Sequence, residues 1–166
     1  MSNADVNGLS LHYQEHGDDG ETLVMLHGGF GTGDSFGPVL DELAATRRVI
    51  TPDLQAHGGT ADIDRPMRFE AMADDIAGLI RHLGLDQADV LGYSLGGGAA
   101  LRLAIQHPRL VRRLVVLSAP PNATAGTRKS GPASTGWDAS LSRCSSSRRC
   151  IPRTRRWRRG LRTSPS

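Results

Sequence analysis

The hydrophobic pattern between residues 5 and 117 consists of short apolar runs separated by longer segments with helical spacing. Alternating apolar and polar residues over 9–15 predict a half-buried strand, and the turn signal Asn7-Gly8 before it predicts a hairpin with a strand that ends at Asp5–Val6. Continuous apolar runs are typical of strands buried on both faces. We expect such strands at 22–26, 48–53, 88–92 and 111–117.

Three segments carry the spacing of amphipathic helices. The first spans 36–43, with Asp34 or Ser35 as its N-cap. The second spans 69–83 and stops at Gly84, because glycine readily takes the left-handed conformation that ends many helices. The third runs from residue 95 to about 106 and stops where His107 precedes a proline.

The regular alternation of strands and helices predicts right-handed βαβ units, and so an α/β fold with a mostly parallel sheet flanked by helices. In such sheets ligands bind beyond the carboxyl ends of the strands. Three polar or glycine-rich segments follow predicted strands and should meet at that edge, namely His27–Phe30, Asp53–His57 and the segment around Ser94.

The segment Gly92-Tyr-Ser-Leu-Gly96 has the G-x-S-x-G pattern between a predicted strand and a predicted helix. A strand that runs directly into a helix forces the serine between them into a strained conformation with its side chain exposed. Glycines two residues before and after the serine leave room for the two backbones to approach closely. The pattern therefore predicts that Ser94 is a nucleophile, with the N–H of Leu95 beside it at the helix N-terminus.

The chain has 166 residues and a formal net charge of +3, but the charge is unevenly distributed. Residues 1–124 are acidic, whereas residues 125–166 are rich in Arg and Ser and carry a single acid, Asp138. The second segment shows no hydrophobic period, so we expect it to be disordered. We divide the chain into a partial core domain, 1–124, and a basic tail, 125–166.

The same composition limits the partners and the location. No apolar run approaches the length of a membrane span and no leader pattern opens the chain, which predicts a cytoplasmic protein without a membrane partner. The two cysteines and six histidines form no metal-ligand spacing, and we expect no metal and no cofactor. The arginine clusters of the tail, interleaved with Trp157, leave nucleic-acid binding open as a less favoured reading.

Residues 5–122 resemble the α/β-hydrolase fold family. The resemblance is carried by four segments in the family's order: Leu26–Phe30, Pro52–Gly58, Gly92–Gly97 and His107–Leu117. It implies a serine hydrolase of the esterase type, which acts by acyl transfer on a small acyl substrate. A serine at position 94, where the family's epoxide hydrolases and dehalogenases use an aspartate, favours ester-type substrates.

The resemblance also assigns roles to individual residues. Ser94 is the nucleophile, and the backbone N–H of Leu95 together with that of Gly29 or Phe30 forms the oxyanion hole. His27 is expected to have a structural role in its loop. Asp53 and His57 are the alternative acid and base, although the family uses their loop mainly for packing.

The sequence departs from the family after Ser94. The family's triad continues with an acid and then a histidine, but only His107 and Asp138 follow the serine here, and neither is well placed. We expect the fold to lack its last strands and the enzyme to be impaired, with a frameshift near residues 125–128 as the explanation. A non-catalytic remnant is the main alternative reading, and the strand at 111–117 is expected to be an exposed edge through which the chain self-associates.

Overall fold

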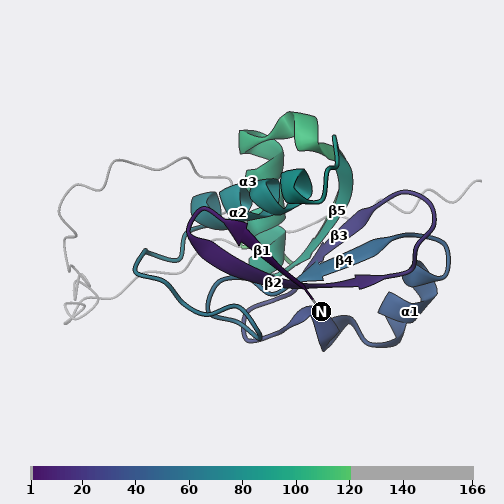
Figure 1. The fold of residues 1–166 in the computed structure, drawn as a ribbon, viewed down its shortest axis with the longest axis horizontal. Coiled ribbons are helices and arrows are strands. Elements are labelled where there is room, and N and C mark those ends of the chain that lie inside the picture. The colour runs from purple at the N-terminus through teal and green to yellow at the C-terminus, as the bar shows by residue number, and fades with distance from the viewer. Residues whose placement is uncertain (1, 121–166) are drawn as a thin grey trace, which may run out of the picture. The chain divides into compact units, whose positions relative to one another are not determined.

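The computed structural model describes residues 2–120, which form a six-stranded sheet covered by helices on both faces (Figure 1). The strand order is β1-β2-β4-β3-β5-β6, and β4, β3, β5 and β6 are parallel to one another. The antiparallel strands β1 and β2 complete one edge. The strands are β1 Ser2–Val6, β2 Leu9–His16, β3 Leu23–Leu26, β4 Val49–Pro52, β5 Ala88–Tyr93 and β6 Val111–Leu117. The predicted α/β class with a mostly parallel sheet is confirmed.

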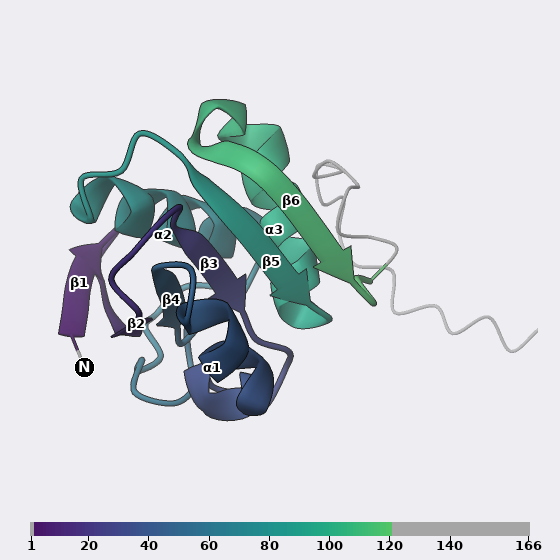
Figure 2. The ribbon, with the colours of Figure 1, turned by 90° about the vertical axis from the view of Figure 1, so that its right-hand side faces the viewer.

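The helices lie on opposite faces of the sheet, as Figure 2 shows. On one face, α2 (Phe69–His82) and α3 (Leu95–Gln106) enclose the larger apolar core, which includes Leu11, Ile50 and Ile76. On the other face, α1 (Pro38–Ala44) covers a smaller core around Met25, Leu40 and Val49. Two short 3-10 turns, η1 (Gly33–Phe36) and η2 (Pro108–Leu110), complete the described elements.

Helix α1 starts two residues later than the pattern predicts. Asp34 and Ser35 lie in η1, whereas α1 has Gly37 as its N-cap and a proline at its first position. The prediction of a cap at Asp34 or Ser35 is therefore wrong. The physical reason is that Pro38 is preorganised for a helix start, and Gly37 takes a φ of +51° that favours glycine.

Strand β6 was expected from its apolar run to be buried, but its residues are partly or fully exposed. Within residues 2–120 it is the edge strand of the sheet, next to β5 and to no other strand. The prediction of a strand buried on both faces is wrong for this reason, whereas the expected exposed edge is present. Val115 and Leu117 are each 48% exposed on it.

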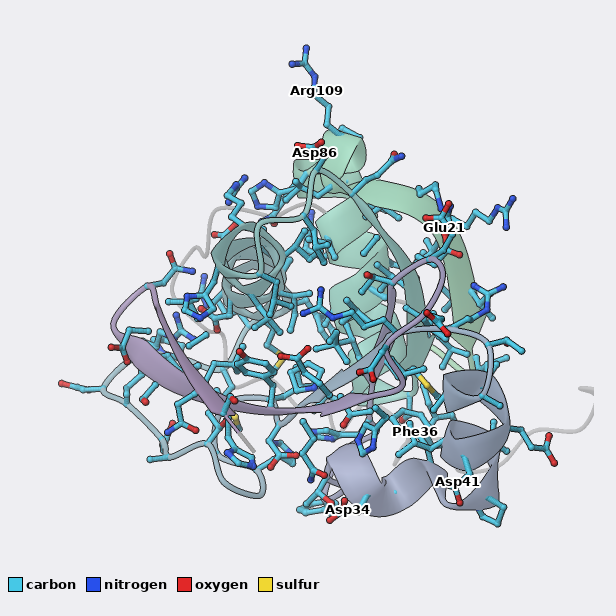
Figure 3. The ribbon with its side chains drawn as sticks, turned by 45° about the vertical axis from the view of Figure 1, so that its right-hand side comes forward. Glu21, Asp34, Phe36, Asp41, Asp86 and Arg109 are labelled. Carbon is cyan, nitrogen blue, oxygen red and sulfur yellow. The ribbon has the colours of Figure 1, made fainter. Side chains whose placement is uncertain are left out.

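The two ends of the parallel strands differ in chemistry. Figure 3 shows Glu21 and Asp86, which precede β3 and β5, and Arg109, which lies in η2 before β6, at one end of the sheet, and Asp34 at the opposite end. At the amino ends, the Arg112 side chain donates hydrogen bonds of 2.8 Å to both carboxylate oxygens of Asp89. These bonds and the neighbouring arginines lower the pKa of Asp89 from its ordinary range. Ion pairs therefore occupy the amino ends of the parallel strands, whereas the candidate site lies at their carboxyl ends.

Candidate active site at the carboxyl ends of the parallel strands

Ser94 lies between β5 and α3 with a backbone φ of +50° and ψ of −110°. A residue with a Cβ rarely takes this conformation, and it persists only where the surrounding structure fixes it. Two hydrogen bonds do so: the N–H of Ser94 donates to the carbonyl of Leu117 at 2.8 Å, and the N–H of Gly98 donates to the carbonyl of Ser94 at 3.1 Å. The strained turn predicted at Ser94 is therefore present.

The glycines around Ser94 allow close approach of three backbones. A Cβ on Gly92 would lie 2.3 Å from the carbonyl oxygen of Gly96, and a Cβ on Gly96 would lie 2.3 Å from that of Leu26. Neither position has room for a side chain. The spacing of the motif thus lets α3 start directly against the ends of β3 and β5.

The loop after β3 lies against the same turn. A Cβ on Gly28 would be 3.0 Å from the Tyr93 ring and 3.5 Å from the Cβ of Ser94. As the first residue of α3, Leu95 has no helical acceptor for its N–H. The N–H of Leu95 therefore follows Ser94 directly at the start of α3, and the loop after β3 lies beside the serine at Gly28.

Residues 28–31 form a tight turn in which the N–H of Gly31 donates to the carbonyl of Gly28 at 3.1 Å. The third residue of this turn, Phe30, has a φ of +62°, as in a type II turn. Its side chain is fully exposed at 104% of the reference area. A Cβ on Gly29 would meet no atom within 4 Å, so the space in front of the turn is open.

His27 is fully buried behind this turn, and both of its ring nitrogens have backbone partners. The carbonyl of Gly28 lies 2.7 Å from Nδ1, and the N–H of Leu54 donates to Nε2 at 3.0 Å. Since Nε2 accepts, Nδ1 must carry the proton. Burial lowers the pKa of His27 below its ordinary value of 6.5, which keeps the ring neutral. These contacts support the structural role expected for His27.

The carboxylate of Asp53 is buried and accepts two backbone hydrogen bonds. Its Oδ1 accepts from the N–H of Gly33 and its Oδ2 from the N–H of Gly59, both at 2.8 Å. A Cβ on Gly58 would lie 2.1 Å from Oδ2. Asp53 thus joins the loops after β3 and β4, and its two oxygens are already occupied by the protein.

His57 is partly buried in the loop after β4, where its ring centroid lies 5.1 Å from that of His27. Its Nδ1 lies 2.8 Å from the carbonyl of Gln55, to which it can only donate. His57 lines a pocket of about 510 Å³ together with Gly29, Phe30, Met67 and Leu95. The structure therefore brings this predicted residue to the same edge as the serine motif.

A second pocket, of about 470 Å³, lies on the other side of the turn at Phe30. Its lining is mainly apolar and comes from the carboxyl ends of three strands and from the segment around α1, including Met25, Phe36, Val39, Leu91 and Leu117. Phe36, labelled in Figure 3, lies at the junction between η1 and α1. Two pockets thus flank the turn that contains Phe30.

His107 lies away from this edge, whereas His12 lies beside the loop after β4, where its carbonyl accepts from the N–H of Asp53 at 2.9 Å. His107 contacts Asp74 of α2 through Nε2 at 2.7 Å, and His12 contacts Asn3 at 3.0 Å. Within residues 2–120, no group of three histidine, cysteine, aspartate or glutamate side chains could hold a metal ion. No described helix is long and apolar enough to cross a membrane. Asp138 and the basic tail lie outside the described residues.

Sequence reasoning missed one regularity of the site. A non-glycine residue with positive φ follows each of the four parallel strands: Phe30 after β3, Ala56 after β4, Ser94 after β5 and Ser118 after β6. Only Ser94 was expected to be strained. A glycine at such a position would have indicated a positive φ in the sequence. These four residues are not glycines, so the sequence carried no such indication. Met67, which is 55% exposed beside the pocket of His57, was also missed because it lies in an irregular segment.

Comparison with known proteins places these features in context. A family model described as alpha/beta hydrolase fold matches residues 21–143. The chain is 36% identical over 128 residues to the sn-1-specific diacylglycerol lipase ABHD11 of Mus musculus, which covers 75% of this chain and 41% of that protein. It is 40% identical over 102 residues to the 2-hydroxymuconate semialdehyde hydrolase of Pseudomonas sp. strain CF600, which covers 59% of this chain and 36% of that protein.

Solved structures show the same likeness. The epoxide hydrolase CorEH without ligand matches with a TM-score of 0.70 and 33% identity, over 79% of this chain and 46% of that chain. A marine microorganism esterase matches with a TM-score of 0.63 and 33% identity, over 65% of this chain and 41% of that chain. The chain thus spans less than half the length of each of these relatives.

Proposed function

The chain belongs to the alpha/beta hydrolase fold family, and on this premise we propose that it cleaves ester-type substrates by acyl transfer through Ser94. The observation that carries the proposal is the strained φ of +50° at Ser94, directly before the unpartnered first N–H of α3. This geometry puts a half-buried serine directly before an N–H donor at a helix N-terminus, which supports an attack of the serine on a carbonyl.

In the proposed reaction, Ser94 Oγ bonds to the carbonyl carbon of the substrate, the bond from that carbon to the alkoxy oxygen breaks, and the serine proton ends on the leaving oxygen. The N–H groups of Leu95 and of Gly29 or Phe30 stabilise the oxyanion, and the alcohol leaves with a proton. Water then releases the acid and restores the serine. The oxyanion donors come from two elements that the backbone holds together, so they require little rearrangement when charge develops.

The nucleophile distinguishes between the activities of the relatives. Both an epoxide hydrolase and an esterase resemble this chain at 33% identity. A serine that attacks a carbonyl forms an acyl ester, whereas the family's epoxide hydrolases are expected to use an aspartate at this position. Ser94 therefore favours the ester-type substrate over the epoxide.

We further propose that Ser94 of this chain reacts slowly. His27 has both ring nitrogens in backbone hydrogen bonds, and Asp53 has both oxygens in backbone hydrogen bonds. Within residues 2–120, neither residue forms a hydrogen bond with the hydroxyl of Ser94. Removal of the base from a Ser-His-Asp triad costs on the order of 10⁶ in kcat in a well-studied serine protease.

Labelling with an alkyl fluorophosphonate tests the proposal, because this probe phosphonylates an activated serine without a need for turnover. We expect slow labelling of the folded chain at Ser94, identified by mass spectrometry of the modified peptide, and none in the Ser94→Ala variant. Ser10→Ala, at an exposed serine on β2, is the matched control and should label like the wild type. Labelling no faster than that of the urea-unfolded chain would refute a prepared nucleophile.

The variant His57→Ala tests the alternative base in the same assay. His57 Nδ1 is occupied by the carbonyl of Gln55, but His57 lines the pocket beside Leu95. If His57 activates Ser94, labelling of this variant should fall to the rate of the unfolded chain. An unchanged rate assigns His57 to the pocket wall, which is the outcome we expect.

A further inference from the structure

Phe30 combines two features that each disfavour folding. Its φ of +62° is strained for any residue with a Cβ, and its aromatic side chain is completely exposed. Since glycine is the preferred residue at the third position of a type II turn, glycine at position 30 would remove both disadvantages. The packing of the described residues gives no reason for a phenylalanine here.

The neighbouring residue makes the contrast sharper. Gly29 occupies the second position of the turn, where a side chain would meet no atom within 4 Å and where φ is not in the left-handed region. The turn thus has its large side chain at the strained position and its glycine at the unstrained one. Because of this arrangement, the space before Gly29 is open and the exposed ring of Phe30 belongs to the next residue.

The open space adjoins another exposed apolar side chain. Met67, which is 55% exposed, and Phe30 line the pocket of about 510 Å³ that also contains Leu95. Leu95 supplies one of the proposed oxyanion donors. An apolar group attached to a carbonyl at Ser94 could therefore remove Phe30 and Met67 from water, which would give the exposed ring a favourable role.

We propose that Phe30 is a specificity-determining residue that, with Met67, binds an apolar chain of the substrate beside the oxyanion hole. The inference rests on the proposed function, because it takes Ser94 and Leu95 as the reacting centre. It adds the substrate class, an ester with an extended apolar chain. It also predicts that Phe30, which recognises the apolar chain of the substrate, reduces the stability of the protein without substrate.

Binding of n-alkyl boronic acids of increasing chain length, measured by isothermal titration calorimetry, tests the inference without turnover. We expect affinity to rise with each methylene group by a factor of roughly fourfold at full burial. Phe30→Gly and Phe30→Ala should both lose most of this increment, while Phe30→Leu should retain part of it. Ile105→Ala, at an exposed apolar residue of α3, is the control and should keep the wild-type increment.

The variants Phe30→Gly and Phe30→Ala together distinguish loss of the ring from a change in folding, because only Phe30→Gly relieves the backbone strain. A wild-type increment in both variants with the boronic acids excludes binding of the acyl chain by Phe30. A parallel series of n-alkyl methylphosphonate monoesters, with the chain on the leaving oxygen, distinguishes the two sides of the ester. The series whose increment depends on Phe30 identifies the side that it binds, and dependence in neither series overturns the inference.

Ser94→Ala separates this inference from the proposed function. Loss of the serine removes the bond to boron, so we expect a similar loss of affinity for every member of the boronic acid series and an unchanged increment per methylene. Unchanged absolute affinities in Ser94→Ala would contradict the nucleophile but leave the role of Phe30 intact. Loss of the increment in Phe30→Gly, together with fluorophosphonate labelling of Ser94 in the wild-type chain, supports both.

Discussion

The backbone N–H of Gly96 donates a hydrogen bond of 3.0 Å to the carbonyl oxygen of His27. This bond joins the first turn of α3 to the end of β3, so the N–H of Leu95 and the turn at Phe30 are fixed relative to each other. The carbonyl of His27 faces α3 while its ring accepts from the loop after β4. One buried residue thereby connects the three loops that form the candidate site.

Gly96→Ala should unfold or severely destabilise the chain. The new Cβ would lie 2.3 Å from the carbonyl oxygen of Leu26, which is backbone and cannot move aside, so we expect a loss of about 3 kcal/mol or more. Gly29→Ala is the matched control, because its Cβ would meet no atom within 4 Å. Urea unfolding followed by circular dichroism measures both. Equal stability of the two variants would contradict the close approach at Gly96.

Ser94→Gly should stabilise the protein while it removes the proposed nucleophile. Glycine relieves the strain of a φ of +50°, for which we expect a gain of about 1 kcal/mol. Ser94→Ala also lacks the hydroxyl but keeps the Cβ, so it should show no comparable gain. Thermal and urea unfolding of the two variants measure the difference. If both variants gain equally, the hydroxyl and not the backbone is the source of the strain.

Asp53→Ala should reduce stability without altering the reactivity of the folded fraction. The substitution leaves the N–H groups of Gly33 and Gly59 without their acceptors, which we expect to cost about 2 kcal/mol or more. Urea unfolding gives the stability, and fluorophosphonate labelling corrected for the folded fraction gives the reactivity. A stable variant that no longer labels would instead assign Asp53 to the chemistry.

Stability should fall as the pH is lowered below about 6.5, in part because of His27. Burial lowers the pKa of His27 in the folded state, so below its ordinary value of 6.5 the unfolded chain binds more protons than the folded one. The contribution of this histidine is thus present above that pH and is lost progressively on acidification. Urea unfolding at several pH values measures the slope.

His27→Gln removes the titrating group and should flatten this slope, although its overall stability will be lower because two backbone partners lose their geometry. His12→Gln, at a histidine hydrogen-bonded to Asn3 on the exposed side of β2, is the matched control. If His27→Gln keeps the full pH dependence between 7 and 5, the dependence comes from other groups.

We propose that the chain self-associates through β6. Its outer side has unpaired backbone groups within residues 2–120, and Val115 and Leu117 are each 48% exposed. Val115→Lys places a charge on this strand and should shift the sedimentation coefficient toward that of a monomer. The control Ile105→Lys, at an exposed position of α3, should leave the sedimentation coefficient unchanged. A wild-type chain that sediments as a monomer at all concentrations would contradict the proposal.

The sequence by itself determined the order of the elements and the position of the serine motif. Helix α3 and strand β6 have the bounds that the pattern predicts, because Pro108 and the glycines around Ser94 act locally on the backbone. Gly84 likewise ends α2, with a φ of +70°. These features depend on neighbouring residues, and neighbouring residues are visible in a sequence.

Only the tertiary structure decided the roles of the remaining site residues. Asp53 is an alternative acid in the sequence, but its carboxylate accepts from the N–H groups of Gly33 and Gly59. The ring of His27 accepts from the N–H of Leu54, 27 residues away. The strain at Phe30, and its position between two pockets, also depend on how the loops after different strands meet. Long-range hydrogen bonds and burial set these properties, so a local pattern could identify the nucleophile but not the groups around it.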